Sequence, residues 1–262
     1  MSETVSTEDL VLTERRGHVL VVTINRPYAR NAVDYATSAA MEKAMDLLDE
    51  SDDLFAGVVT GAGGTFCAGA DLKAAAKNPT RNPPLARGGF GVMRRPPRKP
   101  LIAAVEGYAV GGGFELCLTC DLIVAAENAQ FGLPEVRHNV VAVGGGLFRL
   151  PKQLPYHLAM ELALTGEFRS AAFFRDWGVV NRVVPAGQAL AAALELAESL
   201  QVNGPTAVAA SKEIMFQSSS WGTEEEAWEK QMPIARKATD SEDRAEGLAA
   251  FAEKRKPVWK GR

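Results

Sequence analysis

Residues 101–120 decide the fold, and their sequence is LIAAVEGYAVGGGFELCLTC. Leu101–Val105 is a short apolar run of the kind that forms a buried strand. Three consecutive glycines follow at 111–113, and the residues after them predict a helix over 112–120 whose N-terminus lies at the glycines. A buried strand that leads through glycines into a helix is typical of an α/β domain.

The same alternation continues on both sides of this stretch. Residues 19–24, 56–60 and 122–126 are short apolar runs that predict three more buried strands. Residues 35–50 carry apolar side chains at helical spacing and predict a helix. Short strands that alternate with helices favour an α/β fold class.

The pattern divides the chain into three parts. Residues 1–9 are polar and acidic, resemble neither a secretory signal nor a transit peptide, and are expected to form a disordered tail. Residues 10–186 hold the alternating strands and helices. Residues 187–262 are almost wholly helical in pattern, with amphipathic candidates at 189–200, 205–215, 223–236 and 241–254.

Composition excludes several classes of protein. The chain has 262 residues, of which 47% are hydrophobic, enough for one large core. A net charge of −3 excludes a generally basic nucleic-acid binder, and no apolar run reaches membrane-spanning length. We therefore expect neither a nucleic-acid nor a membrane partner.

The cysteines indicate a reducing compartment. Cys67, Cys117 and Cys120 are an odd and sparse set, which argues against a disulfide framework and fits a cytoplasmic location. Cys117 and Cys120 have CxxC spacing, but no second pair or histidine cluster completes a metal site. We interpret them as helix-packing residues and expect no bound metal.

Two glutamates carry the clearest chemical signal. Glu115 lies in GGGFEL and Glu135 in FGLPEV. Two carboxyl groups can divide acid and base work between them, and glycines let a backbone N–H approach a substrate oxygen closely. Together they suggest proton transfer next to a stabilised oxyanion.

The ordered set of motifs resembles the crotonase superfamily, and within it the enoyl-CoA hydratases. The resemblance runs from about residue 10 to the C-terminus, and its specificity lies in the order of the motifs, since each alone is common. The matching stretches are 24–27, 30–32, 66–72, 99–115, 120–121, 131–135, 246–247 and 251–257.

The resemblance implies a crotonase (ClpP-like) ββα spiral core with a C-terminal helical region that makes trimer contacts. The protein would then be a homotrimer or a hexamer built as a dimer of trimers. The family pattern places the two oxyanion-hole donors at the backbone N–H groups of Ala70 and Gly112.

The resemblance also implies a reaction, the addition of water across the C2–C3 double bond of a 2-enoyl-CoA. Glu115 would hold and activate the water that attacks C3, and Glu135 would deliver a proton to C2. Coenzyme A is then part of the substrate, and no separate cofactor is expected.

The family's CoA contacts map onto one loop and one C-terminal segment. Phe251 and Lys254 match positions that close the nucleotide end, in the same subunit or in a neighbouring one. The loop positions are Arg30, Ala68, Ala70, Asp71, Leu72 and Lys73.

Two segments stand apart from these motifs. Residues 137–146 depart from the usual hydratase sequence, with His138 and Asn139 where an apolar residue and glycine are usual, so acyl specificity is expected to differ. Residues 78–100 are rich in Pro, Gly and Arg and predict a mobile loop that either covers substrate or is a surface excursion.

Other functions remain open at this point. One is another crotonase reaction, such as double-bond isomerisation or a specialised acyl-CoA dehydration. A second is an RNA-binding crotonase homologue, disfavoured because Lys43 is the only basic residue in 35–50. A third is an inactive scaffold, against which the glutamate pair argues.

Overall fold

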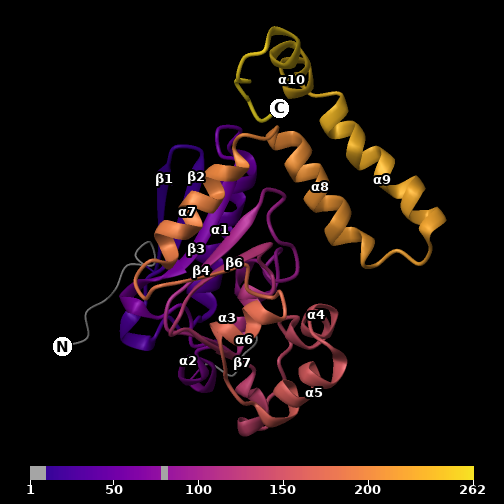
Figure 1. Cartoon of the computed structure of the whole chain (residues 1–262). Helices are drawn as coiled ribbons and strands as arrows, with labels where there is room; N and C mark the ends of the chain where they lie inside the picture. Colours follow the sequence, from indigo (N-terminus) through magenta and orange to yellow (C-terminus); the bar gives the residue numbers. More distant parts are fainter. Residues whose placement is uncertain (1–9, 78–81) are drawn as a thin grey trace.

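The computed structural model describes residues 10–77 and 82–262, so the predicted tail over 1–9 lies outside the described residues. A six-stranded sheet in the order β1-β2-β3-β4-β6-β9 lies beside a three-stranded sheet in the order β5-β7-β8 (Figure 1). The strands are β1 (Val11–Arg16), β2 (Val19–Ile24), β3 (Ala56–Gly61), β4 (Leu101–Val105), β5 (Tyr108–Val110), β6 (Leu122–Ala126), β7 (Gln130–Gly132), β8 (Arg169–Ser170) and β9 (Arg182–Val184).

The large sheet is parallel except for β1, which pairs with β2 as a hairpin. The four strands expected from the sequence are confirmed as β2, β3, β4 and β6, and the α/β fold class is confirmed with them. Both faces of these strands are buried, which explains their continuous apolar runs.

Helices cover both faces of the sheet. They are α1 (Tyr35–Glu50), α2 (Leu72–Lys77), α3 (Gly112–Cys117), α4 (Gly146–Gln153), α5 (Tyr156–Thr165), α6 (Ala171–Asp176), α7 (Ala189–Leu200), α8 (Pro205–Ser218), α9 (Glu224–Thr239) and α10 (Glu242–Glu253). Short 3₁₀ helices add η2 (Pro27–Ala29), η3 (Ala62–Gly64), η4 (Gly89–Gly91) and η5 (Pro134–His138).

Residue size sets how closely α7 approaches the sheet. Its Ala189, Ala193 and Ala197 are fully buried and pack on one face, against alternate strand residues such as Val58 and Ile102. Small side chains at this spacing let the helix axis lie close to the strands. The neighbouring strand residues point to the opposite face and join the main core with α1.

An aromatic cluster fixes α3 beside the small sheet. The rings of Phe114 on α3, Phe131 on β7 and Phe174 on α6 meet edge to face, with centroids 5.0–5.4 Å apart. Each such pair contributes about 0.5–1.5 kcal/mol beyond area burial. The start of α3, where the glycines lie, is thereby held at one end of the β5-β7 pair.

The C-terminal helices project from this body, with α8 and α9 antiparallel and α10 at the far end (Figure 1). The four helices expected after residue 186 are confirmed as α7 to α10. The chain end folds back on α10, where buried Asp243 accepts the N–H groups of Lys260 (2.7 Å) and Gly261 (3.0 Å). In the described part of the chain, no helix is long and apolar enough to cross a membrane.

Candidate active site

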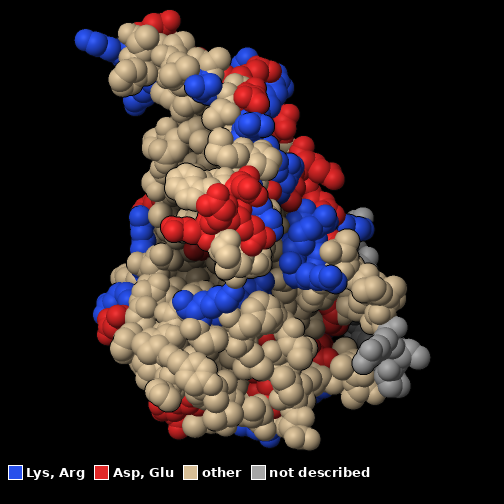
Figure 2. Space-filling model, turned by 90° about the vertical axis from the view of Figure 1, so that its right-hand side faces the viewer, with Lys and Arg blue, Asp and Glu red and all other residues tan. Residues whose placement is uncertain are grey.

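A cavity of about 830 Å³ opens at the start of α3. Its walls come from segments far apart in the sequence: the loop before α2, the loop around η4, η5 with the residues after it, the start of α4, and Phe216 of α8. On the face drawn in Figure 2, Lys and Arg side chains gather around a hollow beneath the projecting helices, and the surface below it is largely uncharged.

Ala70 presents its backbone N–H to this cavity. The N–H of Val33 donates to the Gly69 oxygen (2.8 Å), and the N–H of Asp71 donates to the Val33 oxygen (2.9 Å). Ala70, between them, therefore directs its own N–H to the opposite side, where it lines the cavity. A Cβ added to Gly69 would lie 3.3 Å from the Gly112 nitrogen, so the two predicted donor segments are in contact.

Gly112 is the first residue of α3, where a helix leaves N–H groups without intrahelical acceptors. The chain enters the helix through Gly111, whose φ of 57° and ψ of −129° suit only glycine. Within residues 10–77 and 82–262, neither the Ala70 nor the Gly112 N–H is taken by a protein acceptor. Both remain available to an oxygen atom in the cavity.

Glu115 lies one turn into α3 and is only 4% exposed. Its Oε1 accepts the N–H of Gly146 (2.9 Å), the first residue of α4. A Cβ on Gly144 would lie 2.7 Å from Glu115 Oε2, so the glycine turn 144–146 encloses the carboxylate. Burial raises the pKa of Glu115, while the N–H groups of this turn and the charge of Arg149 oppose the rise.

Glu135 enters the same cavity from η5. A Cβ on Gly111 would lie 3.1 Å from its Oε1, which places Glu135 beside the glycines of α3. Its Oε2 is buried without a hydrogen-bond partner among the described residues. Burial raises the pKa of Glu135, and the negative charge of Glu115 adds to the rise.

The arrangement therefore brings the two glutamates and the two N–H donors to one cavity. A buried carboxyl oxygen without a partner is unusual in a folded protein and indicates a site for water or ligand. Two carboxyl groups beside paired N–H donors can move protons near an oxygen on which negative charge develops.

The predicted CoA-loop positions separate into two groups. Ala68, Ala70 and Leu72 line the cavity, whereas Arg30, Asp71 and Lys73 do not. The Arg30 backbone oxygen accepts the N–H of Ala68 (3.0 Å), so this residue shapes the loop rather than the cavity wall.

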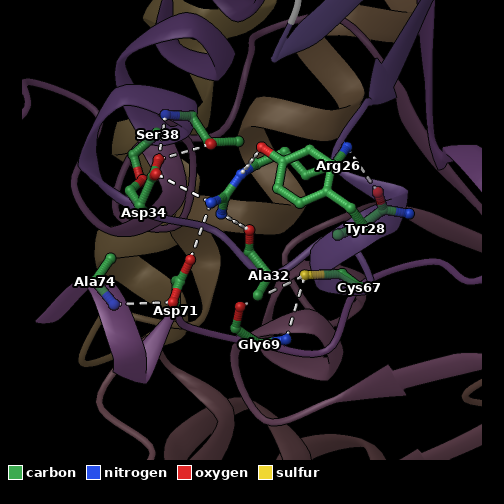
Figure 3. Close-up of polar contacts among 11 residues, drawn as sticks. Arg26, Tyr28, Ala32, Asp34, Ser38, Cys67, Gly69, Asp71 and Ala74 are labelled. Carbon is green, nitrogen blue, oxygen red and sulfur yellow. Dashed lines mark hydrogen bonds and ion pairs between the residues drawn. The ribbon is translucent and has the colours of Figure 1, made fainter. Parts of the chain in front are cut away.

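The Asp71 side chain serves the local structure, as Figure 3 shows. It accepts the N–H of Ala74 (3.0 Å) at the start of α2 and pairs with Arg26 (3.0 Å). Arg26 is buried, pairs also with Asp34 (3.3 Å), and donates to the Ala32 oxygen. Sequence reasoning gave Arg26 no role, although it ties the Ala70 loop to the start of α1.

Phe251 lies on α10 and Lys254 caps its C-terminus, at the opposite end of the molecule from α3 and α4 (Figure 1). Phe251 is 87% exposed, and neither residue lines the cavity of its own chain. The structure therefore does not bring these two predicted residues together with the other site residues.

The loop predicted over 78–100 forms a cavity wall in its described part, 82–100. Arg87 anchors it, because its buried guanidinium pairs with Asp46 (2.8 Å) and Asp49 (2.7 Å) on α1. Phe90, in η4 at φ 53°, lies against Gly112, where an added Cβ would meet its ring at 2.5 Å. The described part of this loop therefore lies against the cavity and is held to α1.

The atypical segment after Glu135 also forms part of the cavity wall. His138 is exposed in η5 and lines the cavity, together with Val140, Val141 and Val143. A smaller apolar cavity of about 380 Å³ between η5, α4 and α5 shares Glu135 and Val141 with the first. Arg149 of α4, which sequence reasoning missed, lines the main cavity on its other side.

The cysteines are not among the residues that line the cavity. Cys67 and Cys117 are buried, Cys120 is half-buried, and all three are free thiols. Burial raises the pKa of Cys67 to about 12, which keeps it protonated. Across the described ranges, no three His, Cys, Asp or Glu side chains group as metal ligands would.

Comparison with known proteins gives a consistent result. A family model described as enoyl-CoA hydratase/isomerase matches residues 14–262. An enoyl-CoA hydratase of Mycobacterium tuberculosis, EchA19, is 43% identical over 96% of each chain. A carnitinyl-CoA dehydratase of Salmonella heidelberg is 44% identical over 97% of this chain and 99% of its own. The crystal structure of an enoyl-CoA hydratase from M. tuberculosis H37Rv superimposes with a TM-score of 0.92 at 49% identity, covering 97% of this chain and 100% of that one.

Proposed function

Because this chain belongs to the enoyl-CoA hydratase/isomerase family, we propose that its cavity hydrates 2-enoyl-CoA thioesters to 3-hydroxyacyl-CoA. The chain is a hydro-lyase that acts on acyl-CoA. The observation that carries the site assignment is the partnerless Oε2 of Glu135, in the same cavity as Glu115 and the two N–H donors.

We assign a role to each group, and the positions of the groups around the cavity support these roles. The thioester oxygen accepts the N–H groups of Ala70 and Gly112, which stabilise the charge that develops on it. Glu115, as carboxylate, takes a proton from water while the water oxygen bonds to C3. The electrons of the double bond pass toward the thioester, and Glu135, as carboxylic acid, gives its proton to C2. One proton transfer from Glu115 to Glu135 then restores the starting state.

The same groups would catalyse dehydration in the reverse direction, by microscopic reversibility. An RNA-binding role gains no support, because α1 carries four acidic residues: Glu42, Asp46 and Asp49 bond the Arg87 region or Arg98, and Glu50 is exposed. Lys43 is the single basic residue on that helix.

We expect crotonyl-CoA or a longer 2-enoyl-CoA to gain water without added metal or redox cofactor. The proposed mechanism needs only protein carboxyl groups and backbone N–H donors. A panel of C4 to C16 enoyl-CoA thioesters, followed by loss of the enoyl-thioester absorbance, measures the activity. Absence of turnover across the panel, or activity abolished by a chelator, would contradict the proposal.

We further propose that the chain assembles as a trimer, or as a dimer of trimers. Its projecting helices expose large apolar side chains, including Met215, Trp228, Met232 and Phe251, and such surfaces mark interaction sites. If Phe251 and Lys254 complete a neighbour's CoA site, then their distance from the cavity of their own chain is explained. The three free thiols fit a cytoplasmic location.

Sedimentation at working concentration is expected to give a mass near three or six times 28.0 kDa. Dilution or mutation that dissociates the oligomer should also weaken CoA binding, measured on the same samples as the sedimentation. A monomer that turns over at the full rate would contradict both the trimer and the shared site.

A further inference from the structure

Arg149 joins three segments around the cavity. Its guanidinium donates to Thr119 Oγ1 (2.9 Å) beyond α3, to the Gly144 oxygen (3.2 Å) in the glycine turn, and to the Met93 oxygen (2.6 Å) in the loop that carries Phe90. Thr119 in turn donates to the Glu115 backbone oxygen (2.8 Å). One side chain thus bonds to the residues just after α3, to the glycine turn and to the loop.

The charge of Arg149 has no carboxylate partner in direct contact. All its acceptors are uncharged, and no ion pair within 4.0 Å is formed with a described residue. The two other inward-pointing arginines, Arg26 and Arg87, each pair with two aspartates. Arg149 is half-buried at the cavity wall, and its guanidinium also lies over the Phe148 ring, 5.3 Å from the centroid. Its charge is therefore held at the cavity without the paired aspartates that the two buried arginines have.

Glu115 is the carboxylate on which this charge acts. Arg149 holds the oxygen of Gly144 at one end of the glycine turn, and Glu115 accepts the N–H of Gly146 at the other. A Cβ on Gly145 would meet Arg149 at 2.4 Å, whereas one on Gly144 would meet Glu115 at 2.7 Å. Arg149 and Glu115 therefore both contact the glycine turn 144–146.

We propose that Arg149 is a positioning residue that keeps Glu115 ionised and holds the glycine turn 144–146 around its carboxylate. This inference rests on the proposed function for the division of work between the glutamates. It explains how two carboxyl groups in one cavity come to hold one charge and one proton. Glu115 has a nearby cation and the N–H groups of the glycine turn, whereas Glu135 has only its own backbone N–H to favour ionisation and an Oε2 without a partner.

The ionisation behaviour agrees with this geometry. Burial raises the pKa of Glu115, and the N–H groups of Gly146 and Gly144 and, after them, the positive charge of Arg149 oppose this rise. Reciprocally, burial lowers the pKa of Arg149, and the negative charge of Glu115 counteracts that. The other titratable or charged groups that line the cavity are Glu135 and His138 of η5 and Arg94 of the loop, and Cys120 lies near Arg149. Removing the Arg149 charge should therefore raise the pKa of Glu115 and let it take up a proton at higher pH.

The test compares Arg149→Gln, which removes the charge, with Arg149→Lys, which keeps it. The matched control is Lys152→Gln, because Lys152 is an exposed cation on the same helix. Infrared difference spectra follow the carboxylic-acid band of Glu115 against pH, and the band is assigned by its loss in Glu115→Gln. In parallel, the acid limb of kcat/KM is measured with crotonyl-CoA.

In Arg149→Gln we expect the protonation midpoint of Glu115 and the acid limb of kcat/KM to move to higher pH by about one unit. Arg149→Lys should leave the midpoint in place and lower kcat about tenfold, since lysine cannot bridge three acceptors in one plane. Lys152→Gln should match the wild type in both measurements.

Two results would overturn the inference. One is a Glu115 midpoint that is unchanged in folded Arg149→Gln. The other, decisive even if Arg149→Gln does not fold, is a raised midpoint in Arg149→Lys, where the charge is kept. The infrared spectra can be recorded without turnover, so failure of the proposed function can be distinguished from failure of this inference. If the wild type does not hydrate enoyl-CoA but the Glu115 midpoint still shifts in Arg149→Gln, the function is refuted and this inference stands.

Discussion

Glu135→Gln and Glu115→Gln are each expected to lower kcat by about 10²–10⁴-fold, the scale of a lost general acid or base. The Glu135 variant has no acid to protonate C2. The Glu115 variant has no base to activate water, although its amide oxygen can still accept the Gly146 N–H and so preserve the turn. Stopped assays of crotonyl-CoA hydration measure kcat, and calorimetry with a CoA thioester measures binding.

Binding of the thioester is expected to stay close to that of the wild type, since neither carboxyl group is assigned to the CoA portion. Glu127→Gln, at an exposed glutamate after β6, is the matched control and should turn over at the wild-type rate. Near-wild-type turnover in either cavity variant would remove that glutamate from the mechanism.

Loss of the Gly112 N–H is expected to lower the rate by at least about 10²–10³-fold, the effect of removing one oxyanion donor. Gly112→Pro deletes this donor, and proline is tolerated at the first position of a helix. The structure adds a complication, because any side chain here meets the ring of Phe90 at 2.5 Å.

The comparison should therefore be made in a Phe90→Ala background. Phe90→Ala/Gly112→Ala keeps the N–H and adds a Cβ, whereas Phe90→Ala/Gly112→Pro adds a Cβ and removes the N–H. The ratio of their kcat values reports the donor, and circular dichroism confirms that both are folded. Equal rates in the two folded proteins would be fatal to the oxyanion assignment.

The sequence revealed those strands whose two faces are buried. β2, β3, β4 and β6 are apolar throughout, so their patterns were unambiguous. β1 has one buried residue followed by five exposed ones, and a hairpin edge strand of this kind has no hydrophobic period to detect.

Length limited the remaining predictions. β5, β7, β8 and β9 have two or three residues each, too few to show a period. The helix expected over 112–120 ends at Cys117, because the following residues turn toward β6. α4 and α5 were missed because they follow the atypical segment, where the glycine run and Pro151 within α4 conceal a helical pattern.

At the site, the sequence predicted the reacting groups better than those that hold them. Glu115, Glu135, Ala70 and Gly112 could be placed because each belongs to a local motif, and all four line the cavity. Arg149 donates hydrogen bonds to Met93 and Thr119, which are 56 and 30 positions away in the sequence. No local sequence pattern indicates contacts of this kind. The roles of these residues stay predictions until the variants above are measured.

The glycines that touch the two carboxylates have a consequence for how this protein can diversify. At Gly111, Gly112, Gly144 and Gly146 even one additional carbon would lie 2.5–3.1 Å from Glu135, Phe90 or Glu115. A larger residue at any of these four positions would therefore displace a side chain that belongs to the site. The outer wall, from Val140 to Val143, carries no such restriction and is exposed at three of its four positions. We therefore expect duplicated copies of this gene to retain the reaction. Their substrate specificity would change first, through substitutions between Val140 and Val143.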